Sequence, residues 1–87
     1  MNNKKILIAE DSPTQAMILK VTLERKGYQV VHAKDGEEAL LLYKEENPDL
    51  LILDVMMPKL TGFELASQLK NGSNPSKVPI LLLTSLT

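Results

Sequence analysis

The chain has 87 residues and a formal net charge of −1 at pH 7, and it is 44% hydrophobic and 24% charged. These values are ordinary for one small soluble domain, and the near-neutral charge argues against direct nucleic-acid binding. The absence of cysteine excludes a disulfide framework and a thiolate metal site. No apolar run approaches a signal-peptide core or a membrane span, so we expect a cytoplasmic protein without membrane contact.

The first third of the chain predicts a strand, a helix and a second strand. Residues 5–9 (KILIA) form a short apolar run rich in isoleucine and leucine, which is typical of a strand. Residues 12–15 (SPTQ) offer a serine cap, a proline at the first helical position and a glutamine three residues after the cap. Gly27 predicts the end of this helix, and residues 28–33 (YQVVHA) predict the second strand.

The remainder continues the alternation of helix and strand. Asp35 and Glu38 repeat the capping pattern for a second helix that ends before Asn47. Residues 50–53 (LLIL) predict the third strand, a third helix runs from about Gly62 to 71, and residues 79–84 (PILLLT) predict the fourth strand. The nearly continuous apolar character of the first, third and fourth strands favours a parallel sheet covered on both faces.

The predicted order is therefore β-α-β-α-β-α-β, which indicates an α/β fold. Right-handed crossovers leave two plausible strand orders, the Rossmann-type 3-2-1-4 and the flavodoxin-like 2-1-3-4. The turn after the first strand reads EDSP, without the glycines of a dinucleotide-binding or phosphate-binding loop. The sequence therefore argues against a nucleotide-binding enzyme.

Acidic residues follow two of the predicted strands. Glu10 and Asp11 come directly after the first strand, Asp54 follows the third, and Thr84 ends the fourth. Because parallel strands end at the same edge of a sheet, the order 2-1-3-4 would bring these side chains into one crevice. Carboxylates packed so closely repel one another unless a cation neutralises them, and Mg²⁺ suits such oxygen ligands. An aspartate in such a site can attack phosphorus and form an aspartyl phosphate.

Simpler interpretations exist for single residues. Asp11 also suits the region before a helix N-terminus, where negative charge is favourable. Asp54 is harder to explain in this way, because the residues after it do not resemble a helix that it could cap. We expect His32, in the second strand, to be structural and to lie away from the acidic edge. The backbone carbonyl of Met56 is a further oxygen suited to a hard cation.

Taken together, the motifs resemble the receiver domains of two-component response regulators. The resemblance runs from residue 4 to residue 85, and it is carried by Glu10-Asp11, DGEEAL at 35–40, PDLLILDVMMP at 48–58, GFE at 62–64, and Thr84. It implies a flavodoxin-like parallel sheet of order 2-1-3-4. It also implies that Asp54 accepts a phosphoryl group from a histidine kinase or a histidine phosphotransfer protein, so that phosphorylation acts as a conformational switch.

The same resemblance implies the other members of the site. Glu10, Asp11, Asp54 and the carbonyl of Met56 would surround Mg²⁺, and the hydroxyl of Thr84 would turn towards the phosphate. Such a module would catalyse at most its own phosphorylation and dephosphorylation, and it would not be a metabolic enzyme.

The chain ends at Thr87, whereas the family continues with a fourth helix, a fifth strand carrying a lysine, and a fifth helix. We therefore expect residues 1–87 to form a single partial receiver domain with impaired phosphorylation. We expect apolar side chains of the third and fourth strands to lie bare on the face of the sheet that carries the first helix. We also expect a homodimer or swapped oligomer through that face or through the edge of the fourth strand. The alternative is a truncated or engineered flavodoxin-like fragment that self-associates without phosphotransfer activity.

Overall fold

The computed structural model describes residues 4–54, 62–71 and 78–83, which form a parallel sheet flanked by helices. The strands lie in the order β2-β1-β3-β4, so the flavodoxin-like order is confirmed and the Rossmann-type order is excluded. The elements follow the predicted alternation: β1 (Lys5–Ala9), α1 (Pro13–Arg25), β2 (Gln29–Ala33), α2 (Gly36–Glu46), β3 (Leu50–Asp54), α3 (Gly62–Asn71) and β4 (Ile80–Leu83).

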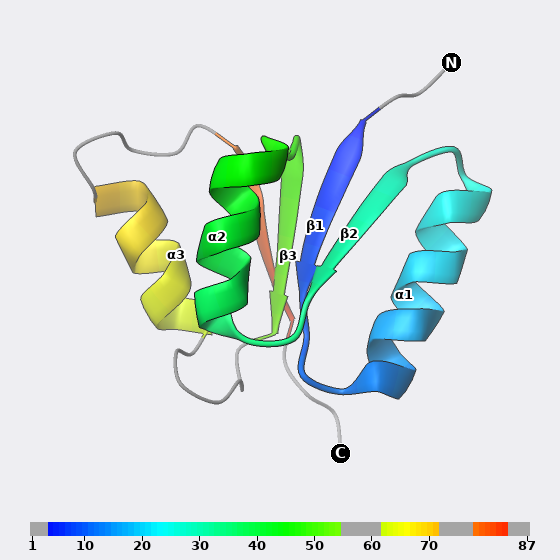
Figure 1. Ribbon diagram of the computed structural model, residues 1–87, viewed down its shortest axis with the longest axis horizontal. Helices are drawn as coiled ribbons and strands as arrows, with labels where there is room; N and C mark the ends of the chain where they lie inside the picture. Colours follow the sequence, from blue (N-terminus) through cyan, green and yellow to red (C-terminus); the bar gives the residue numbers. More distant parts are fainter. Residues whose placement is uncertain (1–3, 55–61, 72–77, 84–87) are drawn as a thin grey trace.

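The helices cover opposite faces of the sheet, with α1 on one side and α2 and α3 on the other (Figure 1). Right-handed crossovers explain this, because the chain moves outward from β1 to β2 and then back across β1 to β3 and β4. Alternate strand residues therefore enter two apolar cores. The core towards α2 and α3 contains Leu7, Ala9, Leu51, Leu53, Leu65 and Leu69, and the core towards α1 contains Ile6, Ile8 and Ile52 with Leu19 and Leu23 beside them.

The helix ends confirm the capping predictions. The Ser12 hydroxyl accepts a hydrogen bond from the Gln15 amide at 3.4 Å, and Oδ1 of Asp35 accepts one from the Glu38 amide at 2.9 Å. After α1, Gly27 has a φ of 95°, a conformation that glycine adopts without a steric penalty. Asn47 ends α2 with a φ of 49°, in the left-handed region.

The prediction of bare apolar side chains is right for β4 and wrong for the middle of β3. Within the described residues β4 is an edge strand, and 50% of Leu81 and 37% of Leu82 are exposed. Ile52, by contrast, is only 5% exposed, because its strand lies between β1 and β4 and its side chain packs with Ile6 and Ile8. Among the described strands, the uncovered apolar surface is therefore concentrated on β4.

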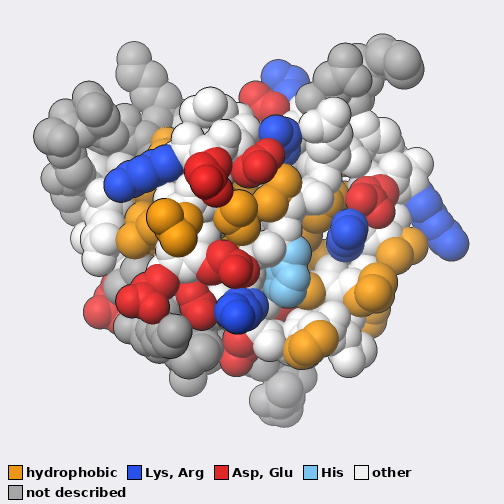
Figure 2. Space-filling model, in the orientation of Figure 1, with side chains coloured by type: hydrophobic (Ala, Val, Ile, Leu, Met, Phe, Trp, Pro, Cys, Tyr) orange, Lys and Arg blue, Asp and Glu red, His pale blue; other side chains and the backbone are white. Residues whose placement is uncertain are grey.

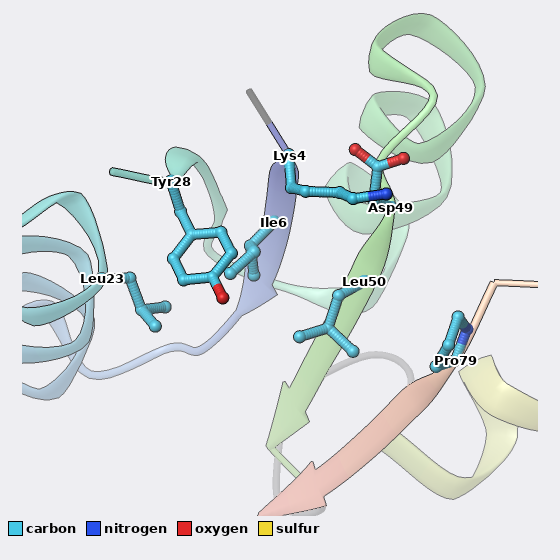
Figure 3. Close-up of a pocket in the computed structure, with 7 residues that line it drawn as sticks. All are labelled: Lys4, Ile6, Leu23, Tyr28, Asp49, Leu50 and Pro79. Carbon is cyan, nitrogen blue, oxygen red and sulfur yellow. The ribbon is translucent and has the colours of Figure 1, made fainter. Parts of the chain in front are cut away.

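At the amino end of the sheet, an apolar recess opens between α1 and β3 (Figure 3). Leu23, Tyr28, Ile6, Leu50 and Pro79 form its apolar wall, and Lys4 and Asp49 lie at its polar side. The recess is at the opposite end of the strands from the predicted acidic site. None of the described helices has the length and apolar run that crossing a membrane requires.

Candidate functional site

Glu10 and Asp54 lie level with each other at the carboxyl edge of two neighbouring strands. All the strand arrows in Figure 1 point towards this edge. In the parallel pairing of β1 with β3, Ala9 is opposite Leu53, so the next residues, Glu10 and Asp54, continue the same register. The sheet itself therefore places the two carboxylates beside each other.

Asp11 completes a cluster of three acids. One carboxylate oxygen from each of Glu10, Asp11 and Asp54 lies within 4.8 Å of the other two. Glu10 is 3% exposed and Asp54 is 5% exposed, whereas Asp11 is exposed to solvent. The cluster thus has two buried members in the sheet and a third member that faces solvent.

Burial and the neighbouring acids change the proton affinity of Glu10. Its pKa rises from 4.5 to about 7, chiefly because burial removes the carboxylate from water. A hydrogen bond from the Ser12 amide opposes this rise, and the Asp54 carboxyl and the charge of Asp11 add to it. Near neutral pH, a proton on Glu10 therefore relieves part of the repulsion within the cluster.

Three hydrogen bonds fix the position of Glu10. Its amide donates to the carbonyl oxygen of Ala33 at 3.0 Å, which extends the contact between β1 and β2 by one residue. Its Oε2 accepts from the Ser12 amide at 3.1 Å. Its own carbonyl oxygen lies 2.7 Å from Nε2 of His32. Backbone and side chain of Glu10 are thus both held by neighbouring segments.

The prediction that His32 lies away from the acidic edge is wrong. His32 is in β2 as expected, but β2 pairs with β1 so that His32 is opposite Ile8, two residues before Glu10. Aligning the ends of the two predicted strands would have revealed this proximity, because both strands end in an alanine before a polar residue. Two other predicted site residues, Met56 and Thr84, lie outside the described residues.

The three acids suit a small divalent cation. Carboxylate oxygens are hard ligands, and oxygens bound to one Mg²⁺ lie about 3 to 4 Å apart because each Mg–O bond is about 2.1 Å. The three oxygens lie within 4.8 Å of one another, which suits one ion either directly or after a small inward movement of one carboxylate. Asp11 is the member free to move in this way, since it is exposed.

Further acidic residues surround this edge of the sheet. The first turn of α2 carries Glu37 and Glu38, and the first turn of α3 carries Glu64. In Figure 2, acidic side chains gather at the lower left, near the starts of these two helices. Negative residues are favourable at helix N-termini, and here they also add to a negative potential that attracts cations and repels polyanions.

Comparison with known proteins identifies relatives along the whole chain. The family model of the response regulator receiver domain matches residues 6–87. The chain is 48% identical over 83 residues to the alkaline phosphatase synthesis transcriptional regulatory protein PhoP of Bacillus subtilis, covering 95% of this chain and 34% of that protein. It therefore spans about a third of the length of the curated relatives that it matches first.

Solved structures show the same similarity in three dimensions. The signal receiver domain of a histidine kinase from Syntrophus aciditrophicus matches with a TM-score of 0.88 and 45% identity, over 97% of this chain and 64% of that one. The chemotaxis protein CheY4 of Vibrio cholerae matches with a TM-score of 0.89 and 37% identity, over 99% of this chain and 72% of that one. Fold, sequence and family model agree, and the chain belongs to the response regulator receiver domain family.

Proposed function

We propose that this chain is a phosphoacceptor module whose Asp54 receives a phosphoryl group with the help of Mg²⁺. The observation that carries the proposal is the convergence of Glu10, Asp11 and Asp54 at one edge of a receiver fold. Asp54 is the proposed nucleophile, because it ends β3 beside the central strand and its oxygen lies within 4.8 Å of both other acids.

The proposed reaction joins the Asp54 carboxylate to phosphorus. An oxygen of Asp54 attacks the phosphoryl group held on a histidine nitrogen of a donor protein, a P–O bond forms and the P–N bond breaks. The electron pair of the broken bond stays on the imidazole nitrogen, which takes up a proton. Bound Mg²⁺ would offset the charges of the carboxylates and of the incoming phosphoryl group. Glu10 and Asp11 would hold that ion next to the nucleophile.

Receiver domains of response regulators are phosphorylated by histidine kinases, and we propose a histidine kinase or a histidine phosphotransfer protein as the donor here. The roles of Thr84 as a switch hydroxyl and of the Met56 carbonyl as an Mg²⁺ ligand remain part of the proposal. A cytoplasmic location and an activity limited to the chain's own phosphorylation belong to it as well. The regulation of transcription named for PhoP is a property of that longer protein.

Intact-mass spectrometry with a small phosphodonor tests the proposal directly. The wild-type chain, incubated with phosphoramidate and MgCl₂, should gain one phosphoryl group, and a chelator should prevent the gain. Asp54→Asn should gain none, because the amide is not a nucleophile of this kind. Asp49→Asn is the matched control and should react as wild type, since Asp49 is an exposed aspartate at the other end of β3.

Two results would contradict the proposed function. One is the absence of any adduct on the wild-type chain under conditions in which a complete receiver reacts. The other is an adduct that persists in Asp54→Asn, which would place the modification on a different residue.

A second candidate role is self-association through the edge strand β4. It is supported by the exposure of Leu81 and Leu82 on a strand that has only one neighbour among the described residues. An edge strand with exposed leucines can pair with a second copy and extend the sheet. The partner proposed here is another molecule of the same chain.

Sedimentation equilibrium tests this second role. Leu81→Lys should shift the chain towards the monomer, because a charge on an edge strand opposes strand pairing. Leu41→Lys is the matched control, since Leu41 is 64% exposed on α2 and lies outside the sheet. A wild-type chain that sediments as a monomer at all concentrations would refute self-association and leave the phosphoacceptor proposal untouched.

A further inference from the structure

His32 contacts the segment from Glu10 to Ser12, which is called the acidic turn below, and it also faces the start of α1. Its Nε2 lies 2.7 Å from the carbonyl oxygen of Glu10. A backbone carbonyl can only accept a hydrogen bond, so Nε2 carries the hydrogen and donates it. The ring also lines a recess of about 240 Å³ together with Pro13, Ala16, Met17 and Lys20 of α1. The imidazole therefore faces α1 across this recess while it binds the backbone of the segment that leads into that helix.

The bonded carbonyl belongs to the peptide that joins Glu10 to Asp11. A planar peptide held at its carbonyl oxygen cannot rotate freely, so the bond restrains ψ of Glu10 and φ of Asp11 together. These two dihedral angles help to set the directions in which the two carboxylates point. The hydrogen bond from His32 therefore acts on two members of the acidic cluster at once, although it contacts neither carboxylate.

This restraint on the backbone matters because the three carboxylates repel one another. Carboxylates within 4.8 Å of one another repel, and the exposed Asp11 could relieve this by rotating into solvent. The Glu10 amide is tied to Ala33 of β2 at 3.0 Å, and the Glu10 carbonyl is tied to the preceding residue of the same strand. Strand β2 thus holds the peptide groups on both sides of Glu10.

We propose that His32 is a positioning residue for the divalent-cation site, and that its Nε2–H orients the Glu10–Asp11 peptide so that both carboxylates converge with that of Asp54. The inference deepens the proposed function and rests on it for the identity of the ion. The orientation of the turn is a property of the metal-free chain. Groups that orient metal ligands without touching the metal typically change metal affinity by about 10-fold to 100-fold.

Two substitutions separate the hydrogen bond from the shape of the side chain. His32→Phe keeps a flat ring in the recess beside α1 and removes the donor. His32→Gln removes the ring but offers an amide N–H at a similar distance from the backbone. Met17→Ala is the matched packing control, because Met17 lines the same recess, is 61% exposed and makes no part of the bond to Glu10.

Two readouts report on the turn, one without metal and one with it. The first is hydrogen exchange of the Ser12 amide in the metal-free chain, since that amide donates to the Glu10 carboxylate. The second is the Kd for Mg²⁺, from the NMR shifts of the Glu10 and Asp11 amides during titration with MgCl₂. In His32→Phe we expect about tenfold faster exchange and about a tenfold higher Kd. In His32→Gln and Met17→Ala both values should stay within about twofold of wild type.

A purely structural histidine would give a different pattern. If His32→Phe lowers only the thermal midpoint and leaves Ser12 exchange and the Kd unchanged, the proposal is overturned. It is also overturned if His32→Gln behaves like His32→Phe, because the donor would then not be the cause. If the wild-type chain does not respond to Mg²⁺ at all, the proposed function fails, and the exchange of the Ser12 amide alone decides the role of His32.

Discussion

Glu10 should make the metal-free chain less stable as the pH rises. The folded state raises the pKa of Glu10 from 4.5 to about 7, so between these values the folded chain holds a proton that the unfolded chain has released. The stabilising contribution of protonated Glu10 is therefore fully present below pH 4.5 and is lost as the pH rises through 7. Glutamine cannot ionise, so Glu10→Gln should remove this loss.

The size of the effect follows from the two pKa values. Each pH unit over which the folded state binds one extra proton changes the free energy of unfolding by about 1.4 kcal/mol. Between 4.5 and about 7 the total is about 3 kcal/mol, of which about 2.5 kcal/mol falls between pH 5 and pH 8. Relative to wild type, Glu10→Gln should therefore gain about 2.5 kcal/mol of stability over that range.

Urea unfolding followed by circular dichroism at pH 5, 6, 7 and 8, with a chelator present, measures this difference. Glu45→Gln provides the control, because Glu45 is exposed on α2 and its substitution changes the net charge equally. The free energy of unfolding of Glu45→Gln should differ from that of wild type by the same amount at every pH. Parallel stability curves for wild type and Glu10→Gln would refute the reasoning, since they would mean that burial beside Asp54 does not favour the protonated form.

Other predictions concern the core, a helix end, an ion pair and the metal, and urea unfolding measures each. Leu53→Ala should lose about 2–5 kcal/mol, since Leu53 is completely buried. Asn47→Ala should lose about 1 kcal/mol and Asn47→Gly should not, because φ is 49° at this position. Lys5→Met should change stability by less than about 1 kcal/mol, because the Lys5–Glu46 ion pair is partly exposed. MgCl₂ at neutral pH should stabilise wild type more than Glu10→Gln, which lacks one of the anionic ligands.

The elements of the fold could be predicted because their signals are local. The cap at Ser12, the cap at Asp35 and the stop at Gly27 each depend on residues within one turn of the helix end. The observed strands match the predicted ranges to within one residue at each described end. The reason is again local, since polar residues or prolines bound the apolar runs. The strand order could not be predicted from the hydrophobic pattern alone, because that pattern allows two orders. The resemblance to receiver domains distinguished between them.

The detailed site depends on contacts that a linear pattern does not contain. The carboxylates of Glu10 and Asp54 could be paired from the strand ends, because parallel strands share an edge. The contact of His32 with the Glu10 carbonyl depends on the register of β1 with β2, and a shift of one residue would turn the imidazole to the other face of the sheet. The burial of Ile52 likewise depends on its neighbours in space.

The central place of β1 in the sheet has a consequence for the dynamics of the site. A strand paired on both sides opens only when much of the sheet opens, whereas loops and edge strands fray at a lower free energy. Glu10 and Asp54 continue two interior strands, so their mutual position fluctuates little before global unfolding. An ion that binds between them restricts few additional backbone dihedrals and loses little conformational entropy. The capacity to bind that ion should therefore disappear in the same cooperative transition as the fold itself.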